Sequence, residues 1–283
     1  MRASPRLLQT AILTAVVFGA AACGDSITGA PARPRVAYTL GSVMGTESFV
    51  SGWDTRGSAG TLGFGRGGGD VTWTWSVNSS AATPSNAEFF PADNSNFFLG
   101  RFANDTATLA LSNLDLHDGV TVDFDLYIIG SWDGIDTTHI PGGGNLRWGG
   151  PDEWLMTWEG QFPAAICTSF ANNNGASDTG PAPTQEFNGS GDPNSACGHG
   201  NSVPAGTGTA TPGLFGSLGY LWDGAGTPNP SDAVYHFHIP IAHTGPTFSV
   251  TFFGRGLQGV ADESWGIDNI SVTIACAVPL NCA

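Results

Sequence analysis

Apolar and polar residues alternate along five segments of this chain, and this two-residue period constrains the fold more than any other feature of the sequence. The five segments are 71–77, 120–128, 233–241, 248–252 and 270–274. A β-strand sends successive side chains to opposite faces of its sheet, so each segment predicts a strand with one buried face.

Four further segments, 37–43, 48–53, 106–114 and 154–160, also favour strands. Helices are disfavoured because the 283 residues include 41 Gly and 18 Pro, the two residues least compatible with a helix interior. The sequence therefore predicts an all-β fold with little helix outside the N-terminal segment. Many strands with long Gly-rich connections are typical of two packed antiparallel sheets, here a jelly-roll-like β-sandwich.

The N-terminus has the three parts of a secretory signal peptide. Arg2 and Arg6 precede an apolar run at 7–17, and small residues follow before Cys23. The run is shorter than the roughly 20 residues that a membrane-spanning helix needs.

We therefore expect one folded domain with an exported leader. The predicted parts are a signal peptide at 1–22, Cys23 with a flexible tether at 23–35, a single β-sandwich at 36–275 with a long loop at about 167–214, and a disulfide-pinned tail at 276–283.

The segment 20–24 (Ala-Ala-Ala-Cys-Gly) resembles the lipobox of bacterial lipoproteins. This resemblance implies that Cys23 is lipidated, and Gly24 after it implies an outer-membrane or cell-surface location. The alternative is ordinary cleavage at an A-x-A site, which would release a secreted protein.

The other four cysteines suit an oxidising compartment, since their number is even. Three pairings are open. Proximity in sequence favours Cys167 with Cys197 and Cys276 with Cys282.

The charge balance argues against nucleic-acid binding. There are 9 Lys+Arg against 24 Asp+Glu, a formal charge of −15, and no lysine occurs in the chain. Affinity for nucleic acids comes mainly from basic side chains that neutralise phosphates. An acidic surface of this kind is compatible with divalent cations and with solubility outside the cell.

The strongest metal candidate is Asp268, because the period of 270–274 extrapolates to place it on the apolar face of its strand. A buried carboxylate needs a hydrogen bond, an ion pair or a metal. Asp262, Glu263 and Asn269 are close enough in sequence to join it, and oxygen ligands of this kind predict calcium. The alternative is that Asp268 accepts backbone N–H groups and that Asp262 and Glu263 form a solvated turn.

A second cluster predicts a ligand-binding rim. Trp132 and Trp154 would offer flat rings for a sugar, with Asp133 and Asp152 beside them as hydrogen-bond acceptors. The alternative is a hairpin loop, since Asp133 and the following Gly form a good turn dipeptide.

Two weaker hypotheses concern His and Glu residues. His236 and His238 share one face of a predicted strand and could bind zinc with a third ligand such as His243; the alternative is simple exposure. Glu153 and Glu159 are six residues apart, roughly 20 Å along a strand, which is too far for a glycosidase pair.

Three segments, 96–102, 124–134 and 262–269, resemble uncharacterised exported bacterial jelly-roll proteins; they include the motifs SWDG and DESWGIDN. The last segment is also similar to the closing strand of concanavalin-like and galactose-binding-like sandwiches, including MAM-type modules. The resemblance implies an extracellular jelly roll for adhesion or glycan binding, in some members with structural calcium. It implies cation or loop contacts for Asp268 and Asp133.

These observations predict an exported, lipid-anchored, non-catalytic carbohydrate-binding or adhesion protein with a calcium site. Its partner would be a glycan or another cell-surface component, and it would meet the membrane only through its lipid. The first alternative is a structural surface or matrix protein without a small ligand. A less favoured alternative is a polysaccharide hydrolase.

Overall fold

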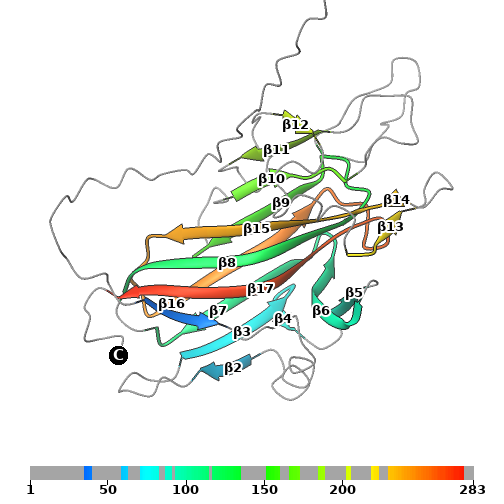
Figure 1. Cartoon of the computed structure of the whole chain (residues 1–283). Coiled ribbons are helices and arrows are strands. Elements are labelled where there is room, and N and C mark those ends of the chain that lie inside the picture. The colour runs from blue at the N-terminus through cyan, green and yellow to red at the C-terminus, as the bar shows by residue number, and fades with distance from the viewer. Residues whose placement is uncertain are drawn as a thin grey trace, which may run out of the picture. The chain divides into compact units, whose positions relative to one another are not determined.

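A computed structural model describes twelve parts of the chain: 35–39, 59–62, 71–82, 87–90, 93–114, 117–134, 151–159, 166–172, 184–188, 202–204, 218–222 and 229–276. All of them belong to one unit, Arg33–Ala283. Their regular elements are all strands, arranged mainly as two antiparallel sheets (Figure 1). The predicted all-β sandwich is confirmed. The described residues contain no helix that could cross a membrane.

The first sheet is built around two long strands. Its order is β15 (Asp232–Ile241), β8 (His117–Gly130), β17 (Glu263–Cys276), β6 (Asp93–Phe102) and β5 (Ala87–Phe90), and β1 (Arg35–Thr39) also pairs with β17. The strand β8 lies between β15 and β17, so the alternating segments at 120–128, 233–241 and 270–274 are neighbours in space (Figure 1).

The second sheet has nine strands. Its order is β12 (Ser202–Pro204), β11 (Thr184–Asn188), β10 (Ile166–Ser169), β9 (Glu153–Trp158), β16 (Thr247–Arg255), β7 (Thr106–Ser112), β3 (Val71–Val77) and β2 (Ala59–Leu62), with β4 (Ser80–Ala81) paired to β3. The strands β13 (Leu221–Trp222) and β14 (Asn229–Pro230) form a separate pair.

Aromatic side chains from both sheets pack together in the core. Phe124 of β8 lies 5.1 Å from Phe252 of β16 and 5.8 Å from Trp154 of β9, measured between ring centroids. Trp154 also lies 6.5 Å from Trp265 of β17. The alternating residues of the strands therefore form the interior of the sandwich, as their period predicts.

One part of the sequence-based description differs from the structure. The segment at about 167–214, predicted as a loop, contains residues of β10 together with β11 and β12, which extend one edge of the second sheet. These strands have three to five residues each; such short strands show no clear alternation, because backbone pairing rather than a long apolar face forms them. The predicted strand at 37–43 overlaps β1, and the one at 48–53 lies outside the described residues.

Several predictions concern residues that the structure does not describe. They include the signal peptide, Cys23, nearly all of the tether and most of the tail. Cys167 is disulfide-bonded. Cys197 and Cys282 lie outside the described residues, as does the side chain of Cys276, so the predicted pairings stay predictions.

A β-bulge interrupts β17. Asp268 lies opposite Asp125, but Ser271 lies opposite Asp123, so β17 has one more residue than β8 between these two pairs. Asn269 in the bulge has a φ of 51°, a left-handed conformation that Asn adopts more readily than most residues.

The bulge changes the face on which Asp268 lies. Ile267, before the bulge, and Val272, after it, both face the interior, because each lies opposite an inward-facing residue of β8. Asp268 is buried, at 2% exposure, as predicted. It lies on the outer face of the sheet, however, where Tyr127 donates a hydrogen bond of 2.8 Å to its Oδ2.

Candidate metal centre between the two sheets

Three buried carboxylates meet where strands of the two sheets begin and end. Asp133 follows β8, Asp152 directly precedes β9, and Glu263 is the first residue of β17. One oxygen from each lies within 4.8 Å of the others. Their exposed fractions are 4%, 0% and 0%. We refer to these three residues as the acidic clamp, since β8 and β17 belong to one sheet and β9 to the other.

A glycine allows the Asp133 and Glu263 segments to approach each other. Gly130 has a φ of +93°, and a Cβ atom there would lie 1.8 Å from the carbonyl oxygen of Asp262. The backbone N–H of Ser131 donates to that same oxygen at 2.8 Å. Any other residue at position 130 would therefore separate the chain segments that carry Asp133 and Glu263.

A second glycine allows another segment of the chain to approach the residue before Asp152. Gly256 has a φ of +86°, and a Cβ atom there would lie 2.2 Å from the carbonyl oxygen of Pro151. The backbone N–H of Asp152 donates to the carbonyl of Gly134 at 2.9 Å. The turn after β8 thus fixes Asp152 directly.

Hydrogen bonds satisfy only part of the clamp. The backbone N–H of Asp133 donates to Oδ2 of Asp152, and that of Gln258 donates to Oε2 of Glu263 at 2.6 Å. No N–H or O–H group of the described residues donates to the second oxygens, Oδ1 of Asp152 and Oε1 of Glu263, which are buried. The two carboxyl groups can share a hydrogen bond only when one of them is protonated. Buried oxygens of this kind are costly unless a proton or a cation reaches them.

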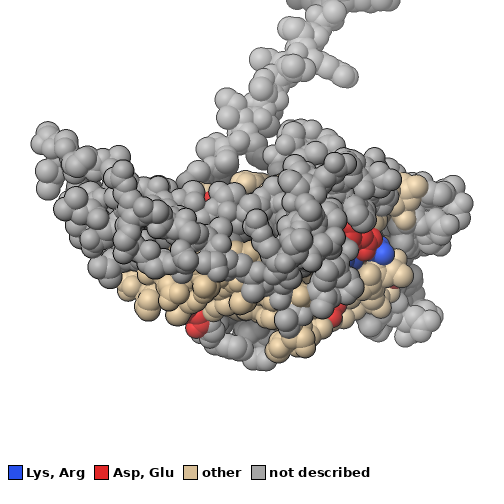
Figure 2. All heavy atoms as spheres, turned by 90° about the horizontal axis from the view of Figure 1, so that it is seen from below, with Lys and Arg blue, Asp and Glu red and all other residues tan. Residues whose placement is uncertain are grey.

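The carboxylate of Glu153 is paired with a basic side chain. Glu153, 3% exposed, adjoins Asp152 in sequence and lies 2.5 Å from an Nη of Arg255. Within the part of the chain that the structure describes, no basic side chain pairs with Asp152 or Glu263. Figure 2 shows basic atoms beside acidic ones on one face of the molecule. Among the described residues, Arg101 and Glu88 form a partly exposed pair, with 3.0 Å between Nε and Oε1.

Burial dominates the protonation of the clamp. It raises the pKa of Asp152 to about 9, and the negative charge of Glu263 adds to that shift. Burial likewise raises the pKa of Glu263 to about 8, against the opposing effect of the hydrogen bond from Gln258. Without a cation, the site therefore retains protons at neutral pH; with a cation, the same carboxylates would ionise.

Only one of the four predicted metal ligands belongs to the clamp. Glu263 does, whereas Oδ1 of Asp262 accepts a hydrogen bond of 2.6 Å from the hydroxyl of Ser131. Asn269 is exposed, and its Nδ2 donates to Asp125 at 2.8 Å. Asp268 accepts hydrogen bonds from the hydroxyl of Tyr127 and from the backbone N–H of Asn269.

The predicted ligand rim is wrong for its two tryptophans. Trp132 and Trp154 are each 0% exposed, so neither ring can stack on a sugar. Nε1 of Trp132 donates to the carbonyl of Ser264 at 2.9 Å, and Trp154 lies in the aromatic core. The two aspartates of the rim, Asp133 and Asp152, belong instead to the clamp.

Sequence reasoning placed the three clamp residues in two separate sites. One local signal joins them, because each acid lies within two residues of a tryptophan. The pairs are Trp132 with Asp133, Asp152 with Trp154, and Glu263 with Trp265. All three indoles are buried, so each tryptophan anchors its strand end in the core and brings the neighbouring acid into the interior.

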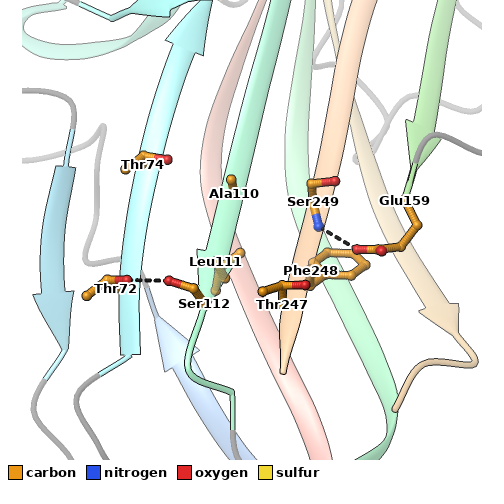
Figure 3. Close-up of a pocket in the computed structure, with 9 residues that line it drawn as sticks. All are labelled: Thr72, Thr74, Ala110, Leu111, Ser112, Glu159, Thr247, Phe248 and Ser249. Carbon is orange, nitrogen blue, oxygen red and sulfur yellow. Dashed lines mark hydrogen bonds between the residues drawn. The ribbon is translucent and has the colours of Figure 1, made fainter. Parts of the chain in front are cut away.

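A groove lies on the second sheet, and none of the three clamp residues lines it. Its volume is about 270 Å³, and its lining includes Thr72, Thr74, Ser112, Glu159, Thr247 and Ser249 (Figure 3). Thr72 and Ser112 share a hydrogen bond of 2.5 Å, and Oε1 of Glu159 accepts one of 2.9 Å from the Ser249 backbone. The side chains that line it are mostly hydroxyls, and its two largest apolar residues, Leu111 and Phe248, are buried.

The three predicted zinc ligands do not come together. His243 pairs with His117, with 2.7 Å between Nδ1 and Nε2. His236 and His238 are exposed and pair with aspartates on β8.

Comparisons with protein-family models, curated proteins and solved structures gave no match. The geometry of the residues is therefore the basis for assigning a function.

Proposed function

We propose that this chain is an exported, non-catalytic β-sandwich whose acidic clamp binds one calcium ion and thereby joins the two sheets. The observation that carries the proposal is the pair of buried oxygens on Asp152 and Glu263 to which no described N–H or O–H group donates once both carboxyl groups are ionised. A cation between the carboxylates would compensate these oxygens and the mutual repulsion of three acids within 4.8 Å.

The chemistry of the ligands favours calcium over other common metals. All three side chains offer carboxylate oxygens, whereas structural zinc sites use mainly Cys and His. Magnesium demands a near-ideal octahedron and keeps several waters, while calcium accepts irregular sets of six to eight oxygens. Backbone carbonyls and water would complete the shell.

An extracellular location fits this proposal. The signal-like N-terminus, the disulfide at Cys167 and the acidic, lysine-free composition support export. Calcium sites in extracellular modules bind with dissociation constants of roughly 10⁻⁴ to 10⁻³ M. Whether Cys23 carries a lipid is answered by the mass of the mature N-terminal peptide.

Calcium titration by calorimetry tests the clamp. The chain is first treated with chelator; we expect one ion per chain for wild type and no measurable binding for Asp152→Asn. The matched control is Asp123→Asn, which removes one negative charge from a partly exposed carboxylate on β8. Wild-type protein that binds no calcium, or an Asp152→Asn variant that binds it normally, would refute the proposal.

A second function, glycan binding, is favoured by the hydroxyl-lined groove. Hydroxyls both donate and accept hydrogen bonds, as sugar hydroxyls do, and Glu159 adds a charged acceptor at the edge of the groove. This proposal replaces the Trp132 and Trp154 rim. It competes with a structural surface protein that has no small ligand.

A polysaccharide panel separates the two alternatives. Binding should be lost in a Thr72→Val, Thr247→Val double variant, which removes two groove hydroxyls. The control is Thr251→Val on the same strand as Thr247; its hydroxyl bonds to Thr108 and does not line the groove. Absence of binding across the panel would favour the structural alternative.

A further inference from the structure

Two histidines on β15 lie side by side on the outer face of the first sheet. His236 and His238 are separated by one residue, so they share a face at a spacing of roughly 7 Å. The side chain between them, Phe237, stacks on Phe124 in the interior at 5.0 Å. The exposed fractions of the two histidine side chains are 54% and 61%.

Each histidine ring is held by a carboxylate of the adjacent strand. Nδ1 of His236 lies 2.9 Å from Oδ1 of Asp125, and Nδ1 of His238 lies 2.5 Å from Oδ1 of Asp123. Both are direct cross-strand pairs in the register of β15 and β8. The same arrangement thus occurs twice in succession on one face of the sheet.

The bulge in β17 supports one of these carboxylates. Nδ2 of Asn269 donates to Oδ2 of Asp125 at 2.8 Å, while Oδ1 of Asp125 contacts His236. Asn269 reaches this position in its left-handed conformation. Asp125 is therefore fixed from two sides.

A carboxylate that accepts a hydrogen bond from Nδ1 leaves the lone pair on Nε2, where it can bind a metal. When a neutral imidazole donates its Nδ1–H to a carboxylate, Nε2 carries the lone pair, and metal-binding histidines commonly have such an acidic partner. Among the described residues, neither His236 nor His238 makes a hydrogen bond through Nε2.

We infer that His236 and His238 together bind one divalent ion of the zinc type, with Asp125 and Asp123 as the outer residues that orient the rings. Imidazole nitrogen suits zinc and other late transition metals far better than calcium. Water fills the remaining positions, because the site faces solvent. This surface site uses none of the residues of the acidic clamp and does not depend on the proposed calcium function.

Zinc titration of the calcium-saturated full chain tests this inference. We expect one zinc ion per chain, with at least a tenfold loss of affinity in His236→Ala and in His238→Ala. The variants Asp125→Asn and Asp123→Asn should weaken binding by roughly 10-fold to 100-fold, the usual effect of removing an orienting partner. His243→Gln is the matched control and should bind zinc like wild type, since His243 pairs with His117 instead.

The two metal sites are distinguishable in this experiment. Asp152→Asn should abolish calcium binding and leave zinc binding intact, whereas His238→Ala should weaken zinc binding at least tenfold and leave calcium binding intact. Circular dichroism of each histidine variant, compared with that of wild type, reports whether the variant is folded. Undiminished zinc binding in a His236→Ala, His238→Ala double variant, no zinc binding by wild type, or one ion per two chains would overturn the inference.

Discussion

The acidic clamp predicts that chelator-treated protein loses stability as the pH rises and that calcium prevents much of this loss. Burial raises the pKa of Asp152 and of Glu263 in the folded state. In the unfolded chain both acids ionise near pH 4. Between pH 5 and 8 the folded state therefore holds protons that the unfolded state has released, and the free energy of unfolding falls.

The size of the effect follows from the number of protons retained. If the folded clamp keeps only one proton more than the unfolded chain, each pH unit costs about 1.4 kcal/mol. From pH 5 to 8 this amounts to about 4 kcal/mol. For a domain of this size, about 4 kcal/mol corresponds to a decrease in Tm of roughly 8 to 16 °C.

Calcium should oppose this decrease because it replaces the protons. At 10 to 100 times its dissociation constant, calcium adds about 1.4 to 2.7 kcal/mol to the free energy of unfolding. Asp268 contributes a part that calcium does not restore, since burial raises its pKa to about 7 and it lies outside the clamp. The predicted quantity is thus the difference between the curves with and without calcium.

The assay is thermal unfolding followed by circular dichroism from pH 5 to 8, in chelator and in 10 mM calcium chloride. The two curves should diverge as the pH rises. In Asp152→Asn the curves with and without calcium should coincide, because the neutral amide does not attract the ion. The amide oxygen can still accept the hydrogen bond from the Asp133 backbone. Superimposed wild-type curves across this pH range would refute the reasoning.

Three other predictions test single positions. Trp154→Ala should lower the free energy of unfolding in urea by about 3 to 5 kcal/mol, as for other large buried aromatics; an unchanged midpoint would show that the ring is not in the core. Gly130→Ala should weaken calcium binding in calorimetry, because its Cβ would displace the Asp262 carbonyl, and wild-type affinity would contradict the role of Gly130. Asn269→Val should cost roughly 1 to 3 kcal/mol through its left-handed backbone, whereas Asn269→Gly should be nearly neutral in the same unfolding assay; equal effects of the two would exclude backbone strain.

Local sequence pattern was sufficient for most of the sandwich. The alternation around Phe124 and Phe252 predicted β8 and β16, since the two-residue period is a property of the strand itself. The same rule failed at Asp268. One extra residue in a bulge reverses the face of every residue beyond it, and the bulge exists only as a mismatch between β17 and β8.

In the candidate site, the sequence and the tertiary structure also determined different features. The sequence by itself determined that the chain forms strands packed as two sheets and that its composition is acidic. Only the tertiary structure decided that Asp133, Asp152 and Glu263 share one buried site and that the tryptophans beside them face the core. The physical reason is that strand periodicity is local, whereas the distance between carboxylates 19 and 130 residues apart along the chain depends on how the two sheets pack.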